Sequence, residues 1–175
     1  MVSHGQFEKD FLERLAHDVE IELGLPVHIS AGFNDISAFF DPSRRQYNAN
    51  QLLKVLDSES KTEDLKTIGL FQIDLFIPIL TFIFGQAVFK GKTGIVSVYR
   101  LKNEQYGLPR DNALLFERFR KVVIHELGHT FGLIHCHVPS CVMRSTTYVE
   151  DIDQKKFSFC KKCRIELDNS VIKLM

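Results

Sequence analysis

The segment His125-Glu126-Leu127-Gly128-His129-Thr130-Phe131-Gly132-Leu133-Ile134-His135 constrains the fold more than any other part of the chain. His125 and His129 are four residues apart, so in a helix their side chains lie on one face, about one turn from each other. Both imidazoles can therefore reach a single metal ion. Glu126 sits beside the first histidine, where its carboxylate can meet water activated by that ion rather than the ion itself.

The end of the segment supplies a third candidate ligand. Gly132 permits the sharp exit from the helix that His135 needs if it is to turn back toward the same ion. Three neutral imidazoles leave a zinc ion its full double charge and an open fourth position, which is the arrangement for activating water. The alternative is three satisfied histidines in a buried core. We favour the metal site, because clustered imidazoles beside a carboxylate are hard to bury without a metal.

All four cysteines follow this segment, as Cys136, Cys141, Cys160 and Cys163. Paired cysteines separated by a spacer can surround a tetrahedral zinc ion, and four sulfurs leave no position for a substrate, so this second site would be structural. In a reducing compartment the clustering of these cysteines favours metal binding over disulfide formation. A disulfide pair, free buried thiols, or a site in which His137 replaces one sulfur are the alternatives.

Periodicity and turn residues predict the remaining elements. Helices are expected over 7–24, where Gly24 ends the helix, within 48–56, and from the cap residue Asp111 to about Gly132. Strands are expected at 26–30, 68–77, 82–89 and 95–99, with a hairpin connection at 91–94 and a loop at 41–45. The 175 residues contain no internal repeat, which favours one domain.

Charge and composition limit the partners. The chain has 22 basic and 22 acidic residues, so no electrostatic argument favours nucleic acid or an anionic membrane. The first ten residues lack the apolar core of a secretory signal, and the longest apolar run, Leu75 to Phe84, is interrupted by Pro78 and is too short to span a membrane. We therefore expect a cytoplasmic protein, a monomer, with no membrane partner and no nucleic-acid partner.

The two clusters together resemble the archaemetzincin family of metzincin metallopeptidases. The resemblance rests on the extended histidine motif, the cysteine directly after its third histidine, Cys141, Met143 two residues later, and the closing C-x-x-C. Upstream, Asp74-Leu75-Phe76, residues 82–87, Val96-Ser97 and Arg100-Leu101 look like that family's strands above the cleft. The resemblance spans residues 68–163.

This resemblance implies an α+β fold of the metzincin-like zincin type: a twisted mixed sheet, mostly parallel, with a backing helix and an active-site helix. It implies one catalytic domain over residues 1–175, with an upper lobe over about 1–135 and a small cysteine-rich, zinc-binding lower lobe over about 136–175. It makes His125, His129 and His135 the ligands of a catalytic zinc, Glu126 the general base, and Met143 the residue of a supporting turn beneath the metal. The four cysteines would bind a second, structural zinc.

The implied activity is zinc-dependent hydrolysis of peptide bonds, on short peptides, with the choice between aminopeptidase and endopeptidase left open. Residues 82–89 would bind an extended peptide if they form an antiparallel edge strand over the cleft. For a substrate's free amino terminus Asp35, Asp41 and Glu150 are unranked candidates, and Tyr148 is expected to be structural.

Two other functions remain open at this stage. One is a zinc-ribbon-like module that binds RNA or protein with an unused histidine site, for which a basic patch is available, although a solvated face is the simpler interpretation. The patch comprises Lys155, Lys156, Lys161, Lys162 and Arg164. The other is a zinc hydrolase of a non-peptide amide or ester.

Overall fold

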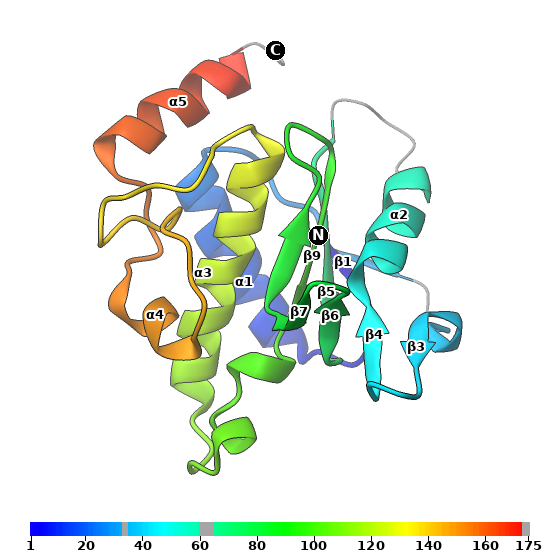
Figure 1. Ribbon diagram of the computed structural model, residues 1–175. Helices are drawn as coiled ribbons and strands as arrows, with labels where there is room; N and C mark the ends of the chain where they lie inside the picture. The colour runs from blue at the N-terminus through cyan, green and yellow to red at the C-terminus, as the bar shows by residue number, and fades with distance from the viewer. Residues whose placement is uncertain (33–34, 60–64, 173–175) are drawn as a thin grey trace.

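Helices and short strands make up most of the computed structural model, which describes residues 1–32, 35–59 and 65–172 (Figure 1). The helices are α1 (Lys9–Leu23), α2 (Ala49–Glu59), α3 (Asn112–Thr130), α4 (Val149–Gln154) and α5 (Lys161–Ile172). The strands are β1 (Val2–Ser3), β2 (Ser30–Ala31), β3 (Phe40–Asp41), β4 (Gln46–Asn48), β5 (Thr67–Phe71), β6 (Leu75–Ile77), β7 (Leu80–Ile83), β8 (Gly85–Ala87) and β9 (Thr93–Ser97). Short 3₁₀ turns cover Ser37–Phe39, Tyr99–Leu101 and Asn103–Tyr106. No helix in the described part of the chain is long and apolar enough to cross a membrane.

Five strands form a mostly parallel sheet in the order β2-β1-β5-β9-β8. β5 and β9 run parallel with Gly69 opposite Ile95, whereas β8 is an antiparallel edge strand with Gln86 opposite Ile95. A second sheet has the order β3-β4-β6-β7, and β7 is its edge. The mixed, mostly parallel sheet implied by the resemblance is confirmed. A hairpin joins β8 to β9 as predicted, but its connection is residues 88–92 rather than 91–94, because Thr93 and Gly94 already belong to β9.

Helices cover both faces of the larger sheet (Figure 1). α2 packs on one face, and α3, backed by α1, packs on the other. Side chains of a strand alternate between its two faces, so Ile95 joins the core under α2 and Val96 joins the core under α3. Every residue of β9 is buried, as expected for a central strand covered on both sides.

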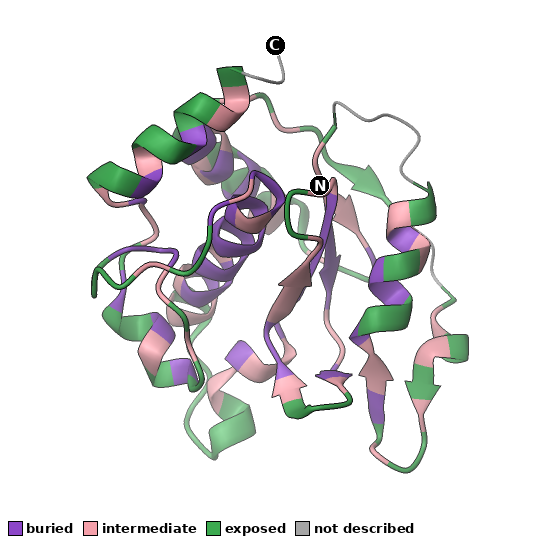
Figure 2. Ribbon diagram, turned by 45° about the horizontal axis from the view of Figure 1, so that its top comes forward, coloured by how far each residue is buried: buried purple, intermediate pink, exposed green. Residues whose placement is uncertain are grey.

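α3 is the helix that places the histidine motif. The Asp111 carboxylate caps it as predicted, accepting the Leu114 N–H at 2.9 Å. Most of the helix beyond its first turn is buried between the sheet, α1 and the cysteine-rich region (Figure 2). The helix ends at Thr130, and Gly132 adopts φ 89°, a left-handed conformation that glycine accepts without strain.

All four predicted strands differ from the structure in their extent. The strand predicted at 95–99 is β9, Thr93–Ser97, and Tyr99 already begins a 3₁₀ turn. Residues 68–77 divide at 72–74 into β5 and β6, which belong to different sheets, because the Phe71 carbonyl accepts from Val98 where the ladder with β9 ends. Residues 82–89 divide at Phe84 between β7 and β8. The strand predicted at 26–30 begins only at Ser30, because the Val27 N–H donates to the Glu20 side chain at 2.8 Å instead of to a neighbouring strand.

Candidate metal centres and cleft

The three histidines of the motif converge at one point. Nε2 of His125 lies 3.1 Å from Nε2 of His129, and the candidate ligand atoms of all three histidines lie within 4.8 Å of one another. His135 reaches this point because the chain turns back after α3, where the Leu133 N–H bonds to the Gly128 carbonyl at 3.0 Å. The structure therefore brings together all three residues that the motif singled out.

Backbone carbonyls fix the orientation of two of these rings. Nδ1 of His125 lies 2.8 Å from the Val142 carbonyl oxygen, and Nδ1 of His129 lies 2.8 Å from that of Leu133. A carbonyl can only accept, so each Nδ1 carries the proton and each Nε2 presents a lone pair to the other. Two facing lone pairs repel unless a cation lies between them. Ligands about 2.0 Å from a tetrahedral zinc are about 3.3 Å apart, so the donor pair fits that ion.

Burial keeps the imidazoles neutral. It lowers the pKa of His125 well below the usual value, and it lowers the pKa of His129 and of His135 as well. A neutral imidazole is the form that binds a metal. The donor set is therefore in the state that zinc requires.

Glu126 lies in the same cleft, buried beside the histidines. Burial raises the pKa of its carboxyl to about 8, and the positive charge of Lys155 acts in the opposite direction. Gly85 of β8 approaches it closely, because a Cβ at that position would lie 2.8 Å from Cγ of Glu126. The carboxyl thus sits between α3 and the edge strand.

Met143 is fully buried against the underside of α3. Its Sδ would lie 2.5 Å from a Cβ at position 128, so only glycine leaves room for the methionine there. The carbonyl of Met143 accepts the Cys136 N–H at 2.9 Å, and the preceding carbonyl, that of Val142, faces His125. We call residues 142–144 the methionine turn. It contacts α3 through the side chain of Met143, which packs against Gly128, and through the backbone carbonyl of Val142, which faces His125.

The four cysteines form a second cluster, with sulfurs within 4.8 Å of one another. Sγ of Cys136 and Sγ of Cys160 are 3.8 Å apart, too far for a disulfide, and none of the four is bonded to another. Sulfurs about 2.3 Å from a tetrahedral zinc are about 3.8 Å apart, so this spacing also fits the ion. A hydrogen bond from the backbone N–H of Cys163 lowers the pKa of Cys160 to about 7, which favours the thiolate that a metal binds.

A cleft of about 620 Å³ opens over the histidines. Residues 80–87 of β7 and β8 form one wall, and residues 145–148, after the methionine turn, form the other. Val122, Glu126 and Lys155 contribute to its floor. The cleft is thus bounded on one side by the open edges of both sheets.

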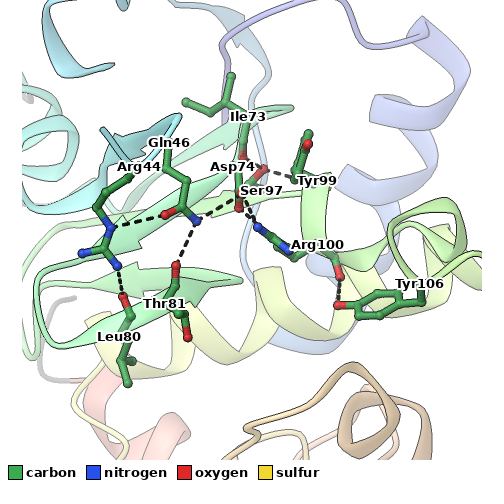
Figure 3. A network of polar contacts seen from close by, with 10 residues as sticks. All are labelled: Arg44, Gln46, Ile73, Asp74, Leu80, Thr81, Ser97, Tyr99, Arg100 and Tyr106. Atoms are coloured by element: carbon green, nitrogen blue, oxygen red, sulfur yellow. Dashed lines mark hydrogen bonds and ion pairs between the residues drawn. The ribbon is translucent and has the colours of Figure 1, made fainter. Parts of the chain in front are cut away.

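A polar network holds the β7 wall in place (Figure 3). The Asp74 carboxylate accepts from both Nε and Nη2 of Arg100, and also from Nε2 of Gln46 at 3.1 Å. Gln46 and Arg44 each donate to a carbonyl of β7, at 2.9 Å. No local pattern reveals these partners, because Gln46 lies 28 residues from Asp74 in the chain.

The remaining sequence expectations have mixed outcomes. Tyr148 is 67% exposed and lines the cleft, so it is not the packed structural residue we expected. The candidate amino-terminus anchors, Asp35, Asp41 and Glu150, do not line the cleft. His137 is exposed and belongs to neither cluster found in the described part of the chain.

The proposed basic patch is incomplete. Lys155 is only 3% exposed, and Arg164 binds the Glu22 carboxylate at 2.5 Å. Lys162 lies 3.9 Å from Glu166. The patch is therefore interrupted at Lys155 and Arg164, although Lys156, Lys161 and Lys162 remain exposed. Lys155, which the sequence placed on the surface, belongs to the cleft.

A family model, curated sequences and solved structures all match this chain and point to the same family. The family model described as Peptidase family M54 matches residues 17–169. The curated archaemetzincin of Pyrococcus horikoshii is 37% identical over 165 residues, which cover 92% of this chain and 87% of that protein. The crystal structure of archaemetzincin from Methanopyrus kandleri superimposes with a TM-score of 0.85 at 32% identity, covering 98% of this chain and 93% of that one. A zinc-dependent peptidase from Methanocorpusculum labreanum gives a TM-score of 0.83 at 31% identity, covering 95% and 97%.

The contact between Gly128 and Met143 can be tested by mutation. Gly128→Ala should lower the free energy of unfolding by about 1–3 kcal/mol, because the new methyl group overlaps Sδ of Met143. In a Met143→Ala background, where that atom is absent, the same substitution should be neutral or stabilising, since alanine favours helix. Urea unfolding of the wild type, the two single variants and the double variant, at one fixed zinc concentration, measures the change in the free energy of unfolding that Gly128→Ala causes in each background. An equal cost in the two backgrounds would show that the methionine is not the obstacle.

Proposed function

Because the chain belongs to peptidase family M54, the archaemetzincins, we propose that it hydrolyses peptide bonds at the cleft above the histidine cluster. The observation that supports this most is the convergence of three neutral imidazoles and one buried carboxylate in a single open cleft. Among the described residues, no fourth metal-ligating side chain joins the three histidines. A metal ion held by them would therefore keep a coordination position open for a substrate group.

In this proposal the histidines hold one zinc ion and the cysteines hold another. His125, His129 and His135 would bind the catalytic ion; Cys136, Cys141, Cys160 and Cys163 would bind the structural ion. When bound, the catalytic zinc supplies Lewis acidity, which polarises the scissile carbonyl and acidifies water. The chain would act as one catalytic domain, with residues 136–175 as its zinc-binding lower lobe.

Glu126 is the general base of the proposed reaction. Its carboxylate takes a proton from the attacking water and passes it to the amine nitrogen that leaves. Burial raises the pKa of this carboxyl to about 8, and the charge of Lys155, which acts in the opposite direction, offsets only part of the penalty on the ionised form that the first step needs. Met143 supports the site from below, through its contact with α3, and touches no substrate.

The edge strand β8 offers a backbone surface for the substrate. The Phe84 carbonyl and the Val88 N–H are used by β9. Antiparallel pairing alternates, so the backbone groups of Gly85 and Ala87 point away from β9. An extended peptide can pair with these free groups and lie along the cleft, which places its bonds above the histidines.

The cleft favours internal peptide bonds over a free amino terminus. Among the described residues that line it, Glu126 is the sole carboxylate, and it is assigned to the base. A substrate's α-ammonium group would therefore find no anionic anchor and would face the cation of Lys155. We infer an endopeptidase that acts on extended, unfolded segments.

The other functions are less well supported. A zinc-ribbon-like binding module needs a continuous basic surface, and burial of Lys155 and pairing of Arg164 interrupt it. A hydrolase of non-peptide amides would use the same catalytic groups, but it would have no use for the open edges of β7 and β8 along the cleft.

The role of Glu126 predicts a selective loss of catalysis. Glu126→Gln should lower kcat/KM for a quenched fluorescent peptide by about 100-fold or more, because the amide cannot accept the proton. Zinc content should stay at the wild-type value, since Glu126 is not a proposed ligand. Glu150→Gln, which changes an exposed carboxylate outside the cleft, is the control. Normal turnover by the Glu126 variant would refute this role.

The edge-strand interaction predicts a change in substrate affinity. Ala87→Pro removes one outward N–H and leaves the pairing with β9 in place, so KM for an extended peptide should rise by about 3- to 10-fold while kcat changes little. Ala87→Leu adds a side chain but keeps the N–H, and serves as the matched control. If Ala87→Pro binds peptide as well as the wild type does, the substrate does not pair with β8.

A further inference from the structure

Lys155 is a buried cation directly beneath the histidine cluster. Its exposed fraction is 3%, although it follows the exposed end of α4. Nζ donates to the Val142 carbonyl at 2.9 Å and to the Arg144 carbonyl at 3.0 Å. These two carbonyls flank Met143, so the ammonium group spans the methionine turn from end to end.

One of these carbonyls is shared with a candidate metal ligand. The Val142 oxygen lies 2.8 Å from Nδ1 of His125 and 2.9 Å from Nζ of Lys155. A carbonyl oxygen has two lone pairs and can accept both hydrogen bonds. Lys155 is therefore separated from the His125 ring by a single acceptor atom.

The rest of the turn is held by the backbone. The Val142 N–H donates to the Ser158 carbonyl at 3.0 Å, and the Met143 carbonyl accepts from Cys136 at 2.9 Å. These bonds restrain the backbone of the turn. The Val142 carbonyl is additionally held by the hydrogen bond from Nζ of Lys155.

The charge of Lys155 is not explained by an ion pair. Among the described residues, no carboxylate lies within 4.0 Å of Nζ. The carboxyl of Glu126 acts on this ammonium group electrostatically but does not contact it. Burying an ammonium without a counter-ion in contact is costly, and an apolar side chain would fill the space at lower cost. The two carbonyls are the groups that this lysine serves.

We propose that Lys155 is a positioning residue for the histidine metal site: by holding the Val142 carbonyl, it fixes the acceptor for the Nδ1–H of His125, so that Nε2 faces the metal. The proposal rests on the metal site described under the proposed function. Groups that orient a ligating histidine in this way typically contribute 10- to 100-fold to metal affinity. In this role Lys155 acts on the metal site through His125.

The test compares full-length proteins with zinc retained at the cysteine site. In Lys155→Met, the affinity of the histidine site for zinc, measured by competition with a chelator, should fall about 10- to 100-fold. The imidazole ¹H–¹⁵N signal of the His125 Nδ1–H in the zinc-loaded protein should broaden through faster exchange with water. Lys155→Arg retains the charge and the donors and should restore most of the affinity.

Lys156→Met is the matched control, because it removes the same charge from the next residue, which is exposed. It should leave affinity and the His125 signal unchanged. Wild-type affinity together with an unchanged signal in Lys155→Met would overturn the proposal. If Lys155→Met does not fold, as judged by circular dichroism and by loss of cysteine-site zinc, Lys155→Gln takes its place: one amide can reach one carbonyl, and wild-type affinity in that variant would likewise overturn it.

These measurements do not depend on hydrolysis. A wild-type protein that cleaves no peptide, with a Lys155→Met variant that loses zinc affinity, would refute the proposed function and support the role of Lys155. A wild-type peptidase whose Lys155→Met variant binds zinc normally would support the proposed function and refute the role of Lys155.

Discussion

The histidine cluster depends on where α3 ends. Two imidazoles four residues apart reach a common point on any helix, but His135, so soon after the helix, can join them only if the chain leaves the helix sharply and doubles back. The left-handed conformation of Gly132 provides this exit, and the bond from the Leu133 N–H to the Gly128 carbonyl closes it. The same return of the chain brings the Leu133 carbonyl to Nδ1 of His129, so the turn both supplies a ligand and orients another.

The exit from α3 also links the two clusters. Cys136 follows His135 directly, and its N–H binds the Met143 carbonyl. The methionine turn thus contacts Cys136 through the Met143 carbonyl and His125 through the Val142 carbonyl. Lys155 donates to the Val142 and Arg144 carbonyls at the two ends of this turn. A metal held by the cysteines would therefore restrain the backbone that carries the third histidine. In the proposed function the cysteine-rich region would thus support the cleft as well as hold its own metal.

The sequence predicted the parts of the site whose spacing is local. The positions of the three histidines and four cysteines follow from helical geometry and from short intervals between ligands, and so does the cap at Asp111. The extent of the strands could not be predicted in this way, because Phe71 ends β5 through a partner at Val98, 27 residues later in the chain and just beyond the end of β9. The network at Asp74 and the burial of Lys155 were missed for the same reason: their partners are set by tertiary packing, and a run of lysines in sequence looks like a solvated surface.

The central claim is that the chain holds two separate metal ions, one at the histidines and one at the cysteines. The most direct test is the zinc content per chain of the protein purified without an affinity tag, beside that of His129→Ala. We expect two zinc ions in the wild type and one in the variant. A single zinc ion in both proteins would contradict this claim, because it would mean that the histidine cluster binds no zinc.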